Sequence, residues 1–311
     1  MLLLTDADVQ RCVAMRDAVQ AMREALQSRA DGLMVTSPRT GFKVGTTGLV
    51  WTPGGFEDTF TLGLRLYLTG DVHRGDQLVA LWDAKTGALR CLALGAALGR
   101  LRTGAIGGAA MAAMAREDAA VLGVVGFGAQ AWQQVEAALA VRPIRRVQAY
   151  RRDRDELVRL VDAGSEQWGL EVVAAPDARA AVEGADIVVT ATNAAEPVIQ
   201  ADWVQPGTHV NALGPKYVGR QEIGLDLAER AAVLACDFPE QYRGEEDFFL
   251  QGTGQLERMR DLAELLASGV QRAPSDVTLF LSHGLAGTEV RLLQAAYAQA
   301  KLRGIGQEIA I

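Results

Sequence analysis

The sequence contains few cysteines and histidines, three of each among 311 residues. Cys12, Cys91 and Cys236 lie far apart, are odd in number and stand in apolar stretches. We therefore expect reduced cysteines packed in the core rather than a disulfide framework. We expect no metal site.

A long apolar run and an excess of positive charge are also missing. The most apolar long stretch, Ala105 to Val125, is interrupted by charged residues at 116–118, so it falls short of the roughly 20 apolar residues of a membrane span. The net charge is −7 with both signs interspersed, which leaves no basic face for a nucleic acid. The N-terminus lacks a basic segment followed by an apolar core. We expect a cytoplasmic protein with neither a membrane nor a nucleic acid as partner.

The N-terminal part of the chain carries strand-like and helical patterns. Leu2 to Thr5 predicts a short strand, and Thr5 with Asp8 three residues later is typical of a helix cap that leads into a helix from Val9 to Arg29. A segment rich in Gly, Thr and Pro follows at 36–55. Further on, the patterns predict strands at Thr61–Thr69, Gln77–Asp83 and Ala88–Ala93, a turn at Lys85-Thr86-Gly87, and a helix from about Ala96 to Ala115.

From Ala119 onward, apolar strands alternate with amphipathic helices. Such alternation is typical of βαβ units and predicts an α/β fold with a parallel sheet covered on both faces. A last helix, Thr288 to Arg303, follows the sheet, and we expect it to pack on the N-terminal region. The predicted strands are Ala119–Gly126, Arg146–Tyr150, Leu170–Ala175, Asp186–Ala191, His209–Leu213 and Ala232–Cys236.

A glycine-rich turn joins the first of these strands to a helix. Its sequence is Gly126-Phe127-Gly128-Ala129-Gln130-Ala131, the Gly-x-Gly-x-x-(Gly/Ala) fingerprint of a dinucleotide site. Gly126 permits the tight turn, Gly128 lets the backbone approach a pyrophosphate, and Ala131 keeps the helix close to the strand. The pyrophosphate would be held by amide N–H groups at the start of the helix.

The next strand ends in Tyr150-Arg151-Arg152-Asp153. NAD sites usually place an acidic residue here to bind the ribose hydroxyls, whereas Asp153 comes late. Arg151 and Arg152 stand where the 2′-phosphate of NADP would lie, which favours NADP with NAD still possible. The alternative is a basic turn that is simply hydrated.

Local motifs along the rest of the chain resemble those of one family, the ornithine cyclodeaminase/μ-crystallin family, and the resemblance covers essentially the whole chain. Each motif is modest alone, but their order and spacing together are specific. Besides the glycine-rich turn, they are Leu4-Thr5-x-x-Asp8-Val9, Ser37-Pro38-Arg39-Thr40, Leu101-Arg102-Thr103-Gly104-Ala105, Thr190-Ala191-Thr192-Asn193, Gly207-Thr208-His209-Val210-Asn211-Ala212 and Ser282-x-Gly284-Leu285-Ala286.

The resemblance implies a Rossmann domain at 116–287 inserted into an α/β domain at 1–115 and 288–311, which binds the substrate and forms a homodimer. It implies a small amino or imino acid as substrate, with its carboxylate held by Arg39 and Arg102. A guanidinium suits that task because it binds a carboxylate in a bidentate fork. The cofactor contacts implied beyond the turn and the two arginines are Thr103, Thr190, Ala191, Thr192, Asn193, Leu213, Ser282 and Gly284.

Two positions depart from the family pattern. Arg65, in Gly63-Leu64-Arg65, stands where ornithine cyclodeaminases carry a lysine, and Lys216 stands where they carry an aspartate. Arginine stays protonated, so Arg65 would relay protons poorly but would serve as a third carboxylate anchor. Three guanidinium groups without an acidic partner, together with Lys216, predict a cationic site that favours an acidic or short apolar substrate over a diamino acid.

If Arg65 cannot relay a proton, another group has to do so. His283 is one candidate, because histidine titrates near neutrality, and its alternative role is packing or hydrogen bonding. Lys216 is another, if its removal from water among other cations lowers its pKa. We expect His209 to be buried in the sheet and His73 to lie in a loop, and we assign no role to either.

Three functions stay open at this point. The first is an NAD(P)H-dependent imine reductase, which works as an amino-acid dehydrogenase in reverse. The second is an ornithine cyclodeaminase-type lyase that releases ammonia. The third is a μ-crystallin-like protein that binds NADP without turnover, which would tolerate the loss of catalytic groups but would not need both Arg39 and Arg102.

Overall fold

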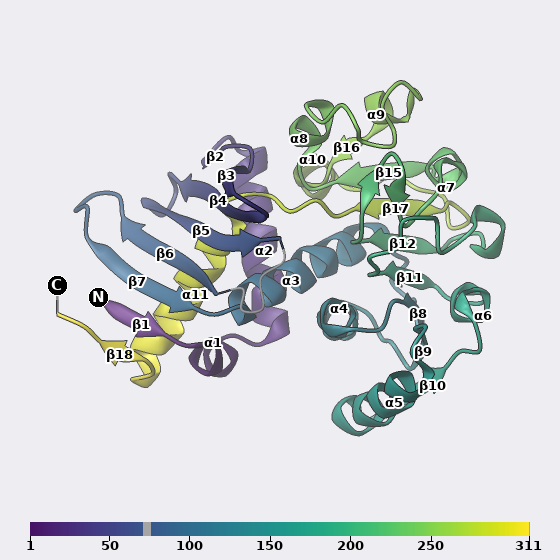
Figure 1. Cartoon of the computed structure of the whole chain (residues 1–311), viewed down its shortest axis with the longest axis horizontal. Helices are drawn as coiled ribbons and strands as arrows, with labels where there is room; N and C mark the ends of the chain where they lie inside the picture. Colours follow the sequence, from purple (N-terminus) through teal and green to yellow (C-terminus); the bar gives the residue numbers. More distant parts are fainter. Residues whose placement is uncertain (71–75, 311) are drawn as a thin grey trace. The chain divides into compact units, whose positions relative to one another are not determined.

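The computed structural model describes residues 1–70 and 76–310, so His73 lies outside the described residues. The chain forms two compact units, Met1–Ala105 with Leu285–Ile311 and Ile106–Gly284 (Figure 1). Helix α3 (Ala97–Met114) is continuous through the point where the first unit ends. The boundaries expected from the sequence, after residues 115 and 287, lie ten and three residues further along the chain.

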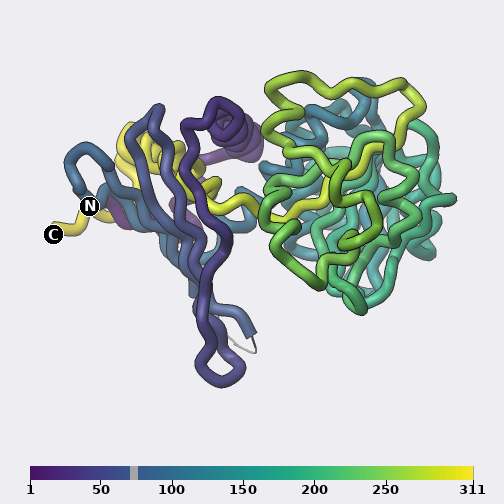
Figure 2. The backbone as a smooth tube through the Cα atoms, turned by 90° about the horizontal axis from the view of Figure 1, so that it is seen from above, coloured from purple at the N-terminus to yellow at the C-terminus, as the bar shows by residue number. Residues whose placement is uncertain are grey.

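The first unit is built on a mixed sheet with the order β18-β1-β7-β6-β5-β4-β2, in which β3 also pairs with β4. Within this sheet β1 and β7 are parallel, and the other described pairs are antiparallel. Figure 2 shows the β3–β4 hairpin projecting from the unit. The strands are β1 (Leu2–Leu4), β2 (Met34–Thr36), β3 (Thr40–Val44), β4 (Thr47–Phe56), β5 (Thr61–Thr69), β6 (Gln77–Asp83), β7 (Leu89–Leu94) and β18 (Gln307–Glu308).

Helices α2 (Met15–Ala30) and α11 (Thr288–Arg303) pack against each other, and α11 lies on the sheet, as expected for the last helix (Figure 1). The capping box of Thr5 and Asp8 is confirmed, but the helix that it begins, α1 (Asp6–Cys12), is short. The prediction of one helix from Val9 to Arg29 was wrong, because the chain is extended at Val13 and Ala14. This break lets Val13 itself be buried between two separate helices.

The second unit contains a sheet in which all strand pairs are parallel, with the order β10-β9-β8-β11-β12-β17-β15-β16. The predicted parallel α/β sheet is confirmed, and β16 and β17 were not predicted. The strands are β8 (Val121–Val125), β9 (Arg146–Tyr150), β10 (Glu171–Ala174), β11 (Ile187–Thr190), β12 (His209–Ala212), β15 (Val233–Cys236), β16 (Arg260–Asp261) and β17 (Thr278–Leu281).

Helices connect these strands and cover the sheet with two separate apolar clusters. The strand order reverses direction between β8 and β11, and in such folds ligands bind outside the carboxyl ends of the strands at this point. The elements are α4 (Ala129–Val141), α5 (Arg154–Trp168), α6 (Ala178–Val182), the 3-10 helix η1 (Ala201–Trp203), the hairpin β13 (Lys216–Tyr217) and β14 (Arg220–Gln221), α7 (Leu225–Arg230), α8 (Pro239–Arg243), α9 (Gln255–Arg258) and α10 (Leu262–Ser268).

The three cysteines are buried and free, as expected. In the part of the chain that the structure describes, no helix combines the length and the apolar character that crossing a membrane requires. The same residues contain no cluster of three or more His, Cys, Asp or Glu side chains suited to a metal ion.

Candidate active site

The glycine-rich turn follows β8 and leads directly into α4. Gly126 has φ of +93°, and a Cβ there would come 2.5 Å from the carbonyl oxygen of Ala191, so only glycine fits without strain. A Cβ on Gly128 would meet no atom within 4 Å, so space is open above this residue. Gly128 is the N-cap of α4 and gives it no side-chain cap, which leaves amide N–H groups at Ala129 and Gln130, both exposed, to face a ligand. Ala131 is fully buried.

A pocket of about 570 Å³ lies beside this turn at the carboxyl ends of the strands. It brings together residues that the sequence predicted as cofactor contacts, from the glycine-rich turn, from the end of β9 and from the segment after β11. The residues that line it are Val125, Gly126, Phe127, Gly128, Tyr150, Arg151, Arg152, Asp153, Ala178, Ala191, Thr192, Asn193, Ala194 and Val198. The open space at Gly128 and the uncapped helix start fit the diphosphate of a dinucleotide.

The two arginines after β9 differ in their surroundings. One guanidinium nitrogen of Arg151 donates to the carbonyl oxygen of Phe127 at 3.1 Å, and another lies 2.6 Å from Oε2 of Glu156. Arg152 is exposed at the pocket. Asp153, which comes late for a ribose contact, caps α5 by accepting a hydrogen bond from the amide of Glu156. Arg151 is therefore engaged within the protein, whereas Arg152 is exposed where it lines the pocket.

Glu222, which the sequence did not single out, connects two loops at this edge of the sheet. Its buried carboxylate accepts hydrogen bonds from Thr190 Oγ1 at 2.8 Å and from the amide and the hydroxyl of Thr192, both at 2.9 Å. It also accepts one from the amide of Gly214. Leu213, a predicted cofactor contact, donates its amide to the carbonyl of Thr190. The segment after β11 is thereby fixed to the segment after β12.

Lys216 is buried, with 3% of its surface exposed. Its Nζ donates to the carbonyl oxygens of Gly214 at 2.7 Å and Ser282 at 3.0 Å. Burial lowers its pKa from 10.5 to about 8, although Glu222 and Asp237 act in the opposite direction. The lowered pKa and its main cause, removal from water, agree with expectation, but the expected neighbouring cations do not: the charged groups that act on Lys216 include the carboxylates of Glu222 and Asp237, which raise the pKa.

His283 lies in the loop after β17. Its ring packs edge-on against Tyr242 with the centroids 4.3 Å apart, and its Nε2 is 3.4 Å from Oε1 of Glu245. The backbone amides of His283 and Gly284 both donate to the buried carboxylate of Asp237, at 2.9 and 2.8 Å. This arrangement fixes the loop that contains Ser282 and Gly284. His209, as expected, is fully buried in the sheet.

In the first unit, Arg65 from β5 and Arg102 from α3 meet at one carboxylate. Oε1 of Glu289, in the first turn of α11, is 3.1 Å from Nη1 of Arg65 and also accepts a hydrogen bond from Nη2 of Arg102. Arg65 donates as well to Oε1 of Gln77 at 2.7 Å and stacks on the ring of Tyr67. The expectation that these guanidinium groups have no acidic partner was wrong, because the sequence gave no sign that Glu289 would fold back onto them.

Burial by itself raises the pKa of Glu289, but the charges of Arg102 and Arg65 outweigh it and hold the pKa below its usual value. Burial lowers the pKa of Arg65, and Glu289 counters this effect. Arg102 is the more buried of the two arginines, with 7% of its side chain exposed against 15% for Arg65. Arg39 lies on the exposed segment between β2 and β3, and the hydroxyl of Thr103 donates a hydrogen bond to the carbonyl oxygen of Gly99 in α3.

Known proteins resemble this chain over its full length. The Delta(1)-pyrroline-2-carboxylate reductase of Bacillus cereus is 29% identical, with 99% of each chain covered. Among solved structures, the Delta(1)-pyrroline-2-carboxylate reductase of Thermococcus litoralis in complex with NADH and L-proline matches with a TM-score of 0.91 and 26% identity, covering 99% of this chain and 100% of that one. An archaeal alanine dehydrogenase dimer with bound NAD matches with a TM-score of 0.89 and 26% identity, covering 100% and 99%. The model of the ornithine cyclodeaminase/mu-crystallin family matches residues 1–303, and the chain belongs to that family.

Proposed function

We propose that this protein is an NAD(P)H-dependent reductase of a small imino acid, which works as an amino-acid dehydrogenase in the opposite direction. The observation that carries the proposal is the dinucleotide pocket beside Gly126 and Gly128, in a chain that also holds the arginine pair Arg65 and Arg102. Two reductases and a dehydrogenase that act on amino or imino acids are similar to the chain from end to end.

Each part of the proposed site has a chemical task. The amides at the start of α4 and the loops fixed by Glu222 hold the dinucleotide. When bound, a reduced nicotinamide supplies the hydride that a carbon–nitrogen double bond accepts. Arg65 and Arg102 hold the carboxylate of the substrate, which orients the adjacent carbon for reaction.

We propose positioning roles for the two residues that the sequence suggested as proton donors. Lys216 is buried and holds two carbonyl groups, and the side chain of His283 is 6% exposed and packs on Tyr242. Lys216, in β13, and His283, in the loop after β17, help to fix the segments predicted to contact the cofactor. A substrate imine protonated in solution would already carry the proton that hydride transfer requires.

We prefer NADP to NAD as the cofactor. Arg152 is exposed at the pocket where the 2′-phosphate of NADP would lie, whereas Arg151 is bonded to Glu156. Asp153 is the acidic residue among those that line this pocket, and its Oδ1 already caps α5. An exposed guanidinium suits a phosphate better than a hydroxyl pair.

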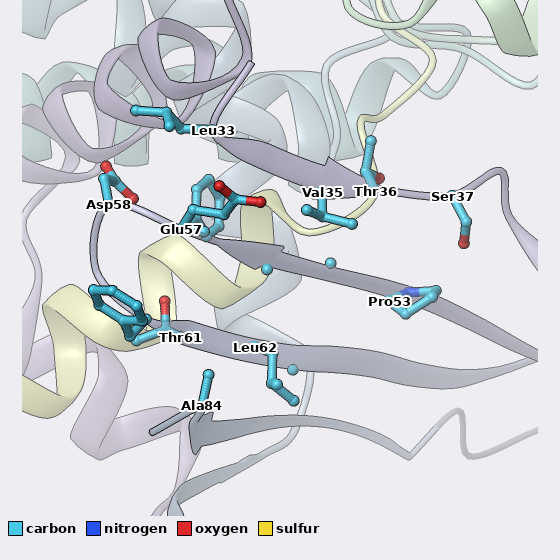
Figure 3. Close-up of a pocket in the computed structure, with 15 residues that line it drawn as sticks. Leu33, Val35, Thr36, Ser37, Pro53, Glu57, Asp58, Thr61, Leu62 and Ala84 are labelled. Carbon is cyan, nitrogen blue, oxygen red and sulfur yellow. The ribbon is translucent and has the colours of Figure 1, made fainter. Parts of the chain in front are cut away.

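We also propose that the protein is a homodimer, formed through the sheet of the first unit. Val35, Phe60 and Leu62 are 58%, 49% and 46% exposed, and they line an apolar hollow of about 710 Å³ on this unit (Figure 3). A large exposed apolar patch is typical of an interaction surface. Leu62→Glu should shift the mass measured by light scattering from dimer to monomer, and a Leu62→Glu chain that stays dimeric would place the interface elsewhere. The cytoplasmic location expected from the sequence stays a prediction.

The activity is tested with a panel of 2-oxo acids, each supplied with ammonia or methylamine and with NADH or NADPH, followed by the nicotinamide absorbance. We expect oxidation of the reduced cofactor that depends on both the 2-oxo acid and the amine. Ammonia released from L-ornithine with only catalytic NAD would instead support a cyclodeaminase. Tight NADPH binding without oxidation by any acid of the panel would support a binding protein.

A further inference from the structure

The charges around Arg65 and Arg102 do not balance. The two guanidinium groups carry two positive charges, and the one carboxylate that bridges them, Glu289, removes one. The cluster formed by these three residues therefore has a net charge of +1. Arg39 adds a further cation to the chain, but its segment is exposed, where water and salt screen a charge.

Glu289 is held in its charged form and in one place. It is 1% exposed and lies in the first turn of α11, where a helix favours a negative charge. Its Oε1 meets both arginines, whereas its Oε2 is buried without a hydrogen-bond partner among the described residues. The carboxylate is thus a fixed internal counter-ion rather than a mobile surface group.

We propose that Glu289 restricts this cluster to a single substrate carboxylate, so that the protein acts on monocarboxylic rather than dicarboxylic imino and amino acids. One carboxylate brings the cluster to neutrality. A second one would add a negative charge without a partner in surroundings with little water, which disfavours binding. The inference rests on the proposed function and names its substrate class. It replaces the expectation of an acidic substrate, which assumed an arginine cluster without a counter-ion.

The test compares two acids in the NADPH-dependent reaction with ammonia, pyruvate with one carboxylate and oxaloacetate with two. We expect the wild-type chain to have at least a tenfold higher kcat/KM with pyruvate. Glu289→Gln keeps the size of the side chain and removes its charge, and it should shift the ratio of the two kcat/KM values at least tenfold toward oxaloacetate. The Kd of NADPH should stay within twofold, because Glu289 lies outside the dinucleotide pocket.

Two control variants separate the charge of Glu289 from general effects. Glu289→Asp keeps the charge and should keep the preference for pyruvate. Glu308→Gln removes a carboxylate that is exposed on β18 of the same unit, and it should leave the ratio unchanged. A merely structural role of Glu289 would lower both kcat/KM values together and leave their ratio as it is.

A wild-type preference for oxaloacetate, or a ratio that Glu289→Gln does not move, would overturn the inference while leaving the proposed function intact. Failure of the proposed function would look different, since neither acid would then oxidise NADPH. In that case, or if Glu289→Gln does not fold, the wild-type chain saturated with NADP is titrated calorimetrically with propionate and with succinate. Tighter binding of propionate supports the inference, and equal or tighter binding of succinate overturns it.

Discussion

At the scale of single residues, Glu289 is the counter-ion that lets two arginines be buried side by side. Removing one partner of a buried ion pair leaves an unpaired charge, which costs more than removing both partners. Glu289→Met leaves two guanidinium groups without their counter-ion and should therefore lower the free energy of unfolding by about 3 kcal/mol, and the double variant with Arg102→Met should recover at least half of that loss. Urea denaturation of the three variants measures the coupling. Losses that simply add would show that the pair contributes nothing as a pair.

The two arginines after β9 allow a direct test of cofactor choice. Arg152→Ala should weaken NADPH binding about tenfold or more by removing charge-assisted hydrogen bonds, and it should leave NADH binding unchanged. Arg151→Ala is the matched variant. Because Arg151 bonds to Glu156 and Phe127, its loss should affect both cofactors alike. Fluorescence titration gives the four affinities. If the ratio of the NADPH and NADH affinities changed only in Arg151→Ala, Arg151 and not Arg152 would be the residue that selects the cofactor.

Lys216 gives the stability of the protein a dependence on pH. Its pKa is lowered to about 8 in the folded chain, so between pH 8 and 10.5 the unfolded chain binds the additional proton. The free energy of unfolding should therefore rise with pH across this window, and this additional stability is lost as the pH falls through about 8. Relative to Lys216→Met, the wild-type chain should gain about 2 kcal/mol between about pH 7 and pH 10 in urea denaturation. Parallel curves for the two chains would show that Lys216 has an ordinary pKa.

At the scale of elements, the loops after the parallel strands are fixed by buried charges. Glu222 accepts four hydrogen bonds, from Thr190 at the end of β11 and from donors on the segments after β11 and β12. Glu222→Gln places an amide NH₂ group among these donors, and an NH₂ group cannot accept their hydrogen bonds. The Kd of NADPH should therefore rise about tenfold, and the melting temperature should fall. Glu229→Gln, at an exposed carboxylate in the same unit, is the control. Lost stability with unchanged NADPH affinity would separate these loops from the cofactor site.

The elements show where local patterns suffice for prediction. Strands β5, β6 and β9 and helix α11 begin and end where the sequence predicts, since each carries a clear apolar periodicity between turn residues. The helix break at Val13 and Ala14 has no glycine or proline to mark it. Strand β4 pairs with β5 despite Pro53 and its glycines, because the neighbouring strand supplies the pairing that local propensity does not.

The candidate site was predictable only in part, because some of its contacts join residues that are far apart in the sequence. The glycine-rich turn is a local signal, and the structure places it at the expected strand end beside a pocket. The partners of the charged residues are not local: Glu289 is 224 positions from Arg65 and 187 from Arg102. Nothing in the local sequence around Glu289, Glu222 or Asp237 distinguishes a buried counter-ion from a surface carboxylate.

For the molecule as a whole, the proposed function comes down to one chemical event, the transfer of a hydride from the cofactor to the carbon of an imine. The most direct measurement follows deuterium from the cofactor to the product. The protein is given a 2-oxo acid, ammonia and NADPH that carries deuterium at the reactive carbon of the nicotinamide, and the amino acid formed is analysed by mass spectrometry. We predict an amino acid with deuterium at Cα, formed in an amount equal to that of the NADPH consumed. Deuterium that remains in the cofactor while no amino acid forms would contradict it.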